Sequence, residues 1–244
     1  MTVQAPRYTV AKAFVIYVPL CQIFGGPAAK SVSHVTAASF GGELMLIAIE
    51  GCLGVGKSTV AKGLADSRRS GVLLEDFESN PFLRAFYQDP VGTAVETEFA
   101  FLLLHFHQLK TNAQSIGKGE IVSDFHLGKD LIYADLNLPD PRAKKMFVDL
   151  YALCVEKAPV PDLLVFLSCT DDLLIKRIRE RDRDFEQQID ADYYSSINAA
   201  YEEYFSRYEG RKISISMNDW DFVKAPELYS TLSKLVDREL AVRV

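Results

Sequence analysis

Short apolar runs alternate with segments of helical periodicity along the chain from Leu44 onward. The apolar runs are rich in β-branched residues and predict five strands, at about 44–50, 72–76, 120–124, 163–169 and 212–216. Each run is followed by one or more segments with apolar residues at helical spacing. Because this is the order of βαβ units, we predict an α/β fold with a five-stranded parallel sheet.

The predicted sheet has helices on both of its faces. Residues 163–167 are all apolar, without the alternation expected of a half-exposed strand. Two predicted helices, at about 93–116 and 190–208, are long and carry aromatic residues at helical spacing, most of which we assign to core packing. No repeat interrupts this region, so we interpret residues 44–244 as one domain.

Residues 1–43 differ in composition from the rest of the chain. Residues 1–42 include three basic residues but no Asp or Glu. A transit peptide has such a composition. We favour another interpretation, in which the true start is Met45, at the first strand, and the preceding segment is a disordered leader or translated upstream sequence.

Composition and charge exclude several classes of protein. The chain has 244 residues, 48% of them hydrophobic and 25% charged, which is typical of a soluble globular protein. A net charge of -6 and a pI near 5.3 argue against nucleic-acid binding, which needs a basic surface. The apolar run at 13–24 is shorter than the roughly 20 residues of a membrane-spanning helix. Four scattered cysteines without C-x-x-C pairs indicate a cytoplasmic location.

A phosphate-binding loop follows the first predicted strand. Residues 51–58 read Gly-Cys-Leu-Gly-Val-Gly-Lys-Ser, which matches G-x-x-x-x-G-K-[ST] between a strand and a helix. The glycines let backbone N–H groups turn toward one anion, and the helix N-terminus adds its positive end. Lys57 is expected to reach the terminal phosphates of ATP, and Ser58 to ligate Mg²⁺. The residues expected to bind ATP are Gly51, Gly54, Val55, Gly56, Lys57, Ser58 and Thr59.

Such a loop occurs in kinases, GTPases and ATP-driven machines. The guanine-reading N-K-x-D motif is absent from the sequence, and the chain is too short for the auxiliary domains of large ATPases. A small-molecule kinase is therefore the leading class.

Four further motifs follow the loop. They are Leu-Glu-Asp-Phe-Glu-Ser-Asn-Pro-Phe-Leu at 74–83, Phe-Tyr-Gln-Asp-Pro at 86–90, Val-Ser-Asp at 122–124 and Arg-Ile-Arg-Glu-Arg-Asp-Arg-Asp-Phe-Glu at 177–186. In sequence and order they resemble the deoxynucleoside kinase family. The resemblance implies a P-loop kinase fold with an arginine-rich lid, a homodimer packed through long helices, and phosphoryl transfer from ATP to the 5'-hydroxyl of a deoxynucleoside.

The resemblance also implies the catalytic residues. Glu75 falls at the position of the family's general base, and Asp124 at that of an acidic residue beside the phosphates and Mg²⁺. Arg181 and Arg183 match the lid, where guanidinium groups stabilise the transferred phosphoryl group together with Lys57. Each assignment has an alternative. Glu75 could be a solvated acid at the end of a strand, Asp124 could cap the following helix, and the arginines could lie on a solvated helix face.

The substrate-binding residues follow from the same resemblance. Tyr87 and Glu186 match the pair that holds the sugar 3'-hydroxyl, whereas Glu98, His105 and Asp130 fall at positions facing the base. An ionised glutamate only accepts hydrogen bonds, so Glu98 favours donor groups of a purine.

One motif departs from the family pattern. The family's acidic-Arg-Ser motif is replaced by Asp124-Phe125-His126, so an arginine is missing. Lys129 is either its substitute or a surface lysine. Two alternatives to a deoxynucleoside kinase stay open. A nucleoside monophosphate kinase of thymidylate-kinase type needs an extra cation for its acceptor's phosphate, and the Phe125 replacement weakens this alternative. A nucleotide sensor without turnover has the altered 124–126 motif as its only support.

Overall fold

The computed structural model describes residues 44–116, 119–183 and 190–241. The predicted leader, residues 1–43, and the predicted substrate-binding residue Glu186 lie outside the described residues. In the ranges that are described, no helix is long and apolar enough to cross a bilayer.

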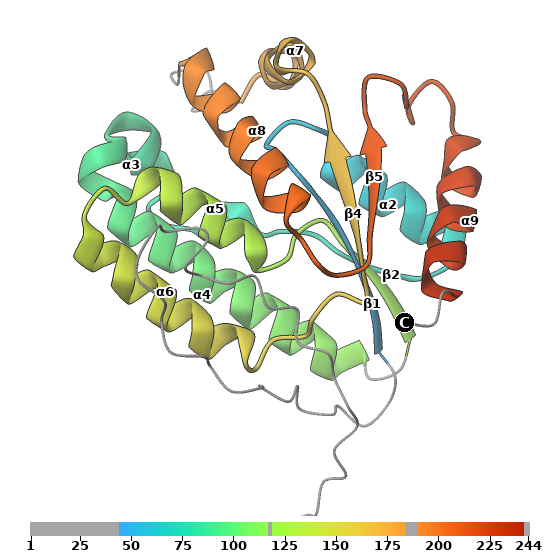
Figure 1. Cartoon of the computed structure of the whole chain (residues 1–244), viewed down its shortest axis with the longest axis horizontal. Helices are drawn as coiled ribbons and strands as arrows, with labels where there is room; N and C mark the ends of the chain where they lie inside the picture. Colours follow the sequence, from blue (N-terminus) through green and yellow to red (C-terminus); the bar gives the residue numbers. More distant parts are fainter. Residues whose placement is uncertain (1–43, 117–118, 184–189, 242–244) are drawn as a thin grey trace, which may run out of the picture.

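Five parallel strands form a single sheet at the centre of the molecule (Figure 1). They are β1 (Leu44–Gly51), β2 (Gly71–Leu73), β3 (Gly119–Ser123), β4 (Leu163–Ser168) and β5 (Lys212–Ser216). Their order across the sheet is β2-β3-β1-β4-β5, and every pairing is parallel. The predicted five-stranded parallel sheet is therefore confirmed.

Strand β2 is shorter than the predicted 72–76, because the chain leaves the sheet after Leu73. The backbone N–H of Glu75 donates to the side chain of Asp124, at 2.7 Å, instead of to a neighbouring strand. The backbone N–H of Asp124 in turn donates to the carbonyl of Leu73, at 3.1 Å. Glu75 is thus held at the edge of the sheet rather than within it.

Helices cover both faces of the sheet, as the uninterrupted apolar strands predict. They are α2 (Lys57–Arg68), α3 (Leu83–Gln88), α4 (Pro90–Ile116), α5 (Gly128–Asn137), α6 (Pro141–Val155), α7 (Asp171–Arg181), α8 (Ala191–Ser206) and α9 (Leu228–Ala241). In Figure 1, α2 and α9 lie on the right of the sheet and α4, α5, α6 and α8 on its left. The long predicted helices are α4, which starts at a proline three residues earlier than expected, and α8.

The core contains two clusters of buried residues. Ile47 and Ile49 of β1 belong to a cluster that includes buried residues of α2, α8 and α9. Leu46 of the same strand belongs to a second cluster, built with α4, α5 and α6. Residues 163–167 of β4 are all buried, which explains why that strand shows no alternation.

The end of β1 approaches β4 so closely that only glycine fits there. Gly51 has a φ of 146°, and a Cβ built on it would lie 2.3 Å from the carbonyl oxygen of Leu167. This contact brings the loop after β1 against the carboxyl end of β4. The loop can take this position only because residue 51 is a glycine and has no side chain.

We predict that Gly51→Ala destabilises the protein more than Gly119→Ala does. Both glycines have nearly the same φ, 146° and 148°, but a Cβ on Gly119 would meet nothing within 4 Å. The backbone strain should cost ~1–3 kcal/mol at either position, whereas only Gly51→Ala adds a steric clash of ~1–3 kcal/mol. Urea denaturation measures the difference, and equal losses of stability would contradict the close approach.

Candidate active site

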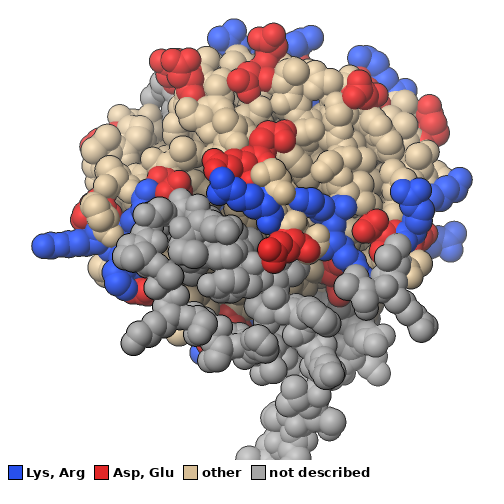
Figure 2. Space-filling view, viewed as in Figure 1, with Lys and Arg blue, Asp and Glu red and all other residues tan. Residues whose placement is uncertain are grey.

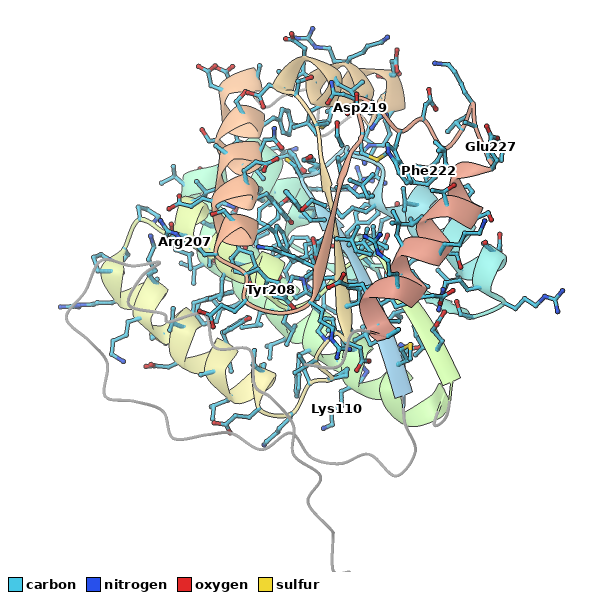
Figure 3. All side chains as sticks on the ribbon, turned by 45° about the vertical axis from the view of Figure 1, so that its right-hand side comes forward. Lys110, Arg207, Tyr208, Asp219, Phe222 and Glu227 are labelled. Atoms are coloured by element: carbon cyan, nitrogen blue, oxygen red, sulfur yellow. The ribbon has the colours of Figure 1, made fainter. Side chains whose placement is uncertain are left out.

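A cleft of about 600 Å³ lies at the carboxyl ends of the strands. Its wall comes from the loop after β1, the chain after β2 and β3, helices α2, α3, α4, α5, α7 and α8, and the segment between β5 and α9. Phe222, which lines the cleft, is labelled on that last segment in Figure 3. Ligands of open parallel sheets bind at this edge, so the cleft is the candidate active site.

The phosphate-binding loop forms one end of the cleft. Of the residues expected to bind ATP, Gly54, Gly56, Lys57, Ser58 and Thr59 line it. Gly51 and Val55 are not on its wall: Gly51 packs against β4, and Val55 donates its N–H to the Cys52 carbonyl at 3.2 Å. The Lys57 ammonium donates to the carbonyls of Gly51 and Cys52, at 2.8 and 3.2 Å. Lys57 is thereby folded onto the loop whose phosphate ligand it is expected to reach.

Asp124 links the loop to the ends of β2 and β3. Its Oδ2 accepts a hydrogen bond from the Ser58 hydroxyl at 2.5 Å, and its Oδ1 accepts one from the Glu75 backbone. The two predicted Mg²⁺ ligands are therefore in contact with each other. In the described part of the chain no three His, Cys, Asp or Glu side chains cluster as a metal site. A hydroxyl and a single carboxylate nevertheless suit Mg²⁺, which is commonly held by one or two protein groups and by phosphates.

Glu75 lies between two cationic side chains. Its Oε2 is 2.6 Å from the Lys129 ammonium, and its Oε1 is 3.0 Å from Nε2 of His105. Burial acts to raise the pKa of Glu75, but the charges and hydrogen bonds of Lys129 and His105 outweigh it and hold the pKa well below its ordinary value. Glu75 is therefore ionised, as a general base must be before it accepts a proton.

Lys129 is buried and is not a surface lysine, because only 6% of it is exposed. Burial acts to lower its pKa, but Glu75 and Glu50 outweigh this and raise the pKa above the ordinary value. The charge of Lys129 also lowers the pKa of Lys57, after burial, which is the larger cause. The cleft thus contains a second buried cation near the phosphate-binding lysine.

His105 is hydrogen-bonded through both ring nitrogens. Nδ1 is 2.7 Å from Oδ1 of Asp130, and Nε2 contacts Glu75. Burial acts to lower its pKa, but the two carboxylates outweigh burial and raise the pKa to about 9. Near neutral pH the ring is an imidazolium that donates to both carboxylates. Asp130 keeps its Oδ2 buried without a hydrogen-bond partner, at the wall of the cleft.

Glu98 lies farther along α4, on the wall of the same cleft. Its Oε1 accepts a hydrogen bond from the side-chain amide of Asn137 at 2.8 Å, and Oδ1 of Asn137 accepts one from the Tyr193 hydroxyl at 3.0 Å. Burial, with a smaller contribution from the charge of Asp130, raises the pKa of Glu98 to about 8. The expectation of an acceptor-only group is therefore wrong near neutral pH, where a protonated Glu98 can also donate.

Three further predicted residues line the same cleft. Tyr87, Arg181 and Arg183 line the cleft, and the Arg183 guanidinium lies 4.2 Å above the centre of the Phe77 ring. Arg177 donates to the carbonyl of Val55 at 2.7 Å, so it ties α7 to the phosphate-binding loop.

Three residues of the site were not singled out in the sequence. Asn137 and Tyr193 position Glu98, and nothing in the sequence distinguishes them from packing residues. Glu50, which is fully buried at the end of β1, accepts hydrogen bonds from the backbones of Gly51 and His126, at 3.2 and 2.8 Å. A charged residue at the end of an apolar strand is the signal that could have found it.

The phosphate-binding loop shares its cleft with an ionised carboxylate that can accept a proton, and the site is therefore that of a P-loop phosphotransferase. A model of the deoxynucleoside kinase family matches residues 47–241, and the chain belongs to this family.

Two curated relatives share about a third of their aligned residues with the chain. A deoxyguanosine kinase of Bacillus subtilis is 30% identical over 158 residues, which are 64% of this chain and 76% of that protein. A deoxyadenosine kinase of Lactobacillus acidophilus is 30% identical over 214 residues, 81% of this chain and 97% of that protein. Similarity to the second relative thus extends over nearly its whole length.

Solved structures show the same fold. The deoxyadenosine kinase of M. mycoides with bound dATP has a TM-score of 0.67 and 25% identity, covering 81% of this chain and all of that one. The same kinase with dCMP and dCDP has a TM-score of 0.69 and 25% identity, covering 79% of this chain. The family and the fold are thus shown by separate comparisons.

We predict that Glu98→Gln abolishes part of the pH dependence of stability. The pKa of Glu98 is about 8 in the folded protein and about 4.3 in an unfolded chain. The folded state therefore binds more protons between these values, and stability falls as pH rises through this window. Glu98→Gln should therefore raise stability by ~3–4 kcal/mol more at pH 8 than at pH 5.

Urea denaturation at several pH values measures this effect. Glu96→Gln is the matched control, since Glu96 lies on the same helix but is exposed. An equal effect of the two substitutions at pH 8 would show that Glu98 is ionised in the folded protein.

Proposed function

We propose that the chain transfers the γ-phosphoryl group of ATP to the 5'-hydroxyl of a purine deoxynucleoside, in nucleotide salvage. The observation that carries this proposal is the position of Glu75, in one cleft with Lys57 and the lid arginines. The relatives named above are deoxyguanosine and deoxyadenosine kinases, which supports a purine substrate.

In the proposed reaction Glu75 accepts the proton of the 5'-hydroxyl. The oxygen of that hydroxyl forms a bond to the γ-phosphorus, and the bond from the γ-phosphorus to the β,γ-bridging oxygen breaks, with its electron pair leaving on ADP. Lys57, Arg181 and Arg183 stabilise the charge on the phosphoryl oxygens. Mg²⁺ would be held by Ser58 and Asp124 and would supply further positive charge to the phosphates.

The base would lie between Glu98 and Asp130. A protonated Glu98 offers one donor and one acceptor, which can pair with the N1 and N6 groups of adenine or the N1 and O6 groups of guanine. The buried Oδ2 of Asp130 is a further acceptor on the wall of the cleft. Tyr87, which lines the cleft, would contact the sugar, and the role of Glu186 at the 3'-hydroxyl stays a prediction. Met217, directly after β5, lines the cleft as well and would lie near the adenine of ATP.

The comparisons do not favour the two alternative functions. A monophosphate kinase needs a cation for its acceptor's phosphate, whereas the buried Lys129 is ion-paired with Glu75. A sensor without turnover does not need an ionised carboxylate beside a phosphate-binding lysine. The face seen in Figure 2 carries acidic side chains interspersed with basic ones, rather than a basic field for nucleic acid.

A cytoplasmic location is part of the proposal. The buried cysteines Cys52, Cys154 and Cys169 are free thiols, as they would be in a reducing compartment.

We also propose that two chains form a homodimer through α4 and α6, and this is testable. Val95 and Leu103 of α4 and Met146 and Leu153 of α6 are exposed, at 46%, 49%, 64% and 57%, on two helices that pack against each other. Large apolar side chains exposed on two neighbouring helices support an interface there. Sedimentation should give twice the chain mass of 27.3 kDa, and Leu103→Glu with Leu153→Glu should give a monomer. A monomeric unsubstituted protein would exclude the dimer.

The proposed reaction predicts activity with deoxynucleosides. With ATP and Mg²⁺, kcat/KM should be highest for deoxyadenosine or deoxyguanosine among the four deoxynucleosides. Adenosine, guanosine and dTMP serve as comparison substrates. Turnover of dTMP instead would support the monophosphate kinase, and turnover of none would support the sensor.

Glu75→Gln is the matched variant for this experiment. It removes the proton acceptor while keeping the shape of the side chain, so kcat should fall by at least ~10²-fold. ATP affinity should stay the same, because the phosphate-binding loop is unchanged. An unchanged kcat would show that another group accepts the proton.

A further inference from the structure

The chain around Glu75 does not by itself fix the direction of its carboxylate. Glu75 lies two residues beyond the end of β2, so it has no partner strand. Its backbone is held by Asp124, but the side chain could still turn about its own bonds. The direction of the carboxylate therefore depends on the groups that contact its two oxygens.

Each oxygen of Glu75 is held by a different helix. Lys129, in the first turn of α5, is 2.6 Å from Oε2, and His105 of α4 is 3.0 Å from Oε1. Two contacts on separate oxygens, from separate elements, fix both the position and the rotation of a carboxylate. This is what a proton acceptor needs, since misplacement of a reacting group by about 1 Å can cost ~10²-fold in rate.

The two cations are themselves held in place. The His105 ring lies between Phe101, stacked at 5.4 Å between ring centres, and Phe125, at 5.1 Å. Its other nitrogen is bonded to Asp130, next to Lys129 on α5. The Lys129 ammonium lies 5.9 Å from the centre of the Tyr133 ring, and its side chain is 7% exposed. Lys129 cannot leave Glu75 without losing its ion-pair partner while still buried, which is costly, and His105 is held in place by Asp130 as well.

Both ring nitrogens of His105 are engaged by carboxylates, so this ring has no nitrogen left to read a base. We propose that Lys129 and His105 are positioning residues that fix the carboxylate of Glu75, and that His105 serves this carboxylate rather than the nucleoside base. This inference rests on the proposed role of Glu75 as the proton acceptor. Other charged groups around Glu75 are Lys57 after β1, Asp124 after β3 and Asp130 on α5.

The test combines Lys129→Met with Glu75→Gln in a double-mutant cycle on the full-length protein. In the unsubstituted background, Lys129→Met should lower kcat by ~10²-fold while the KM for the deoxynucleoside changes less than ~3-fold. In the Glu75→Gln background the same substitution should cost less than ~3-fold, because there is no ionised carboxylate left to position. Lys129→Arg should restore kcat to within ~10-fold of the unsubstituted enzyme, since it keeps the charge.

Lys144→Met is the matched control. Lys144 is also ion-paired with a carboxylate at 2.7 Å, that of Asp135, but outside the cleft. Its substitution should leave kcat and KM unchanged.

Three outcomes overturn the positioning role. They are an unchanged kcat in Lys129→Met, equal losses in the two Glu75 backgrounds, and a loss that appears in KM alone. If thermal melting shows that Lys129→Met does not fold, His105→Gln replaces it in the test, because His105 contacts Oε1 of Glu75. His105→Gln should then lower kcat in the unsubstituted background but not in the Glu75→Gln background. An inactive unsubstituted enzyme would contradict the proposed function, whereas an active enzyme indifferent to these substitutions would contradict only the positioning role.

Discussion

One carboxylate, that of Asp124, joins the three strand ends on which the cleft depends. The carboxylate accepts hydrogen bonds from the Ser58 hydroxyl and from the backbone N–H of Glu75. The backbone N–H of Asp124 donates to the carbonyl of Leu73. Since β2 ends at Leu73, these bonds replace the strand pairing that would otherwise place Glu75. The distance between the phosphate-binding loop and the proposed proton acceptor is therefore set by a side chain at the end of a third strand, and parallel strands bring all three ends to one edge.

The cleft concentrates charges that a folded core normally excludes. Lys57, Lys129, Glu50, Glu75 and His105 are grouped around the same edge of the sheet, and burial acts against the charged form of each. Pairing offsets this cost for the two glutamates, His105 and Lys129, whereas the pKa of Lys57 is lowered. Replacement of such a buried pair by apolar residues is often neutral or stabilising. The arrangement is therefore better explained by the requirement for a positioned, ionised acceptor than by stability.

Sequence reasoning succeeded where the structure is local and failed where it depends on packing. The phosphate-binding loop and five strands could be predicted because glycine spacing and apolar runs act over a few residues. The early end of β2 could not, since it follows from a hydrogen bond to Asp124 across the sheet. Lys129 remained either a substitute cation or a surface lysine, because its burial follows from the packing of α5 against other elements, which the local sequence does not show. The protonation of Glu98 was missed for the same reason: an ionised carboxylate was assumed, and burial decides otherwise.

Helix α4 connects the proposed base-binding part of the cleft with the Glu75 carboxylate, since one face of the helix carries both Glu98 and His105. Glu98 and His105 are seven residues apart, two turns on one side of the helix, and both are buried at the cleft. Val95 and Leu103 of the same helix are exposed. Helix α4, which would contact the base, therefore also holds Oε1 of Glu75 through His105. Asp130 joins His105 to α5, and Lys129 of α5 holds Oε2 of Glu75. A shift of α4 against α5 would change the proposed base contact and the orientation of the Glu75 carboxylate together, so the two proposed roles are coupled through these helices.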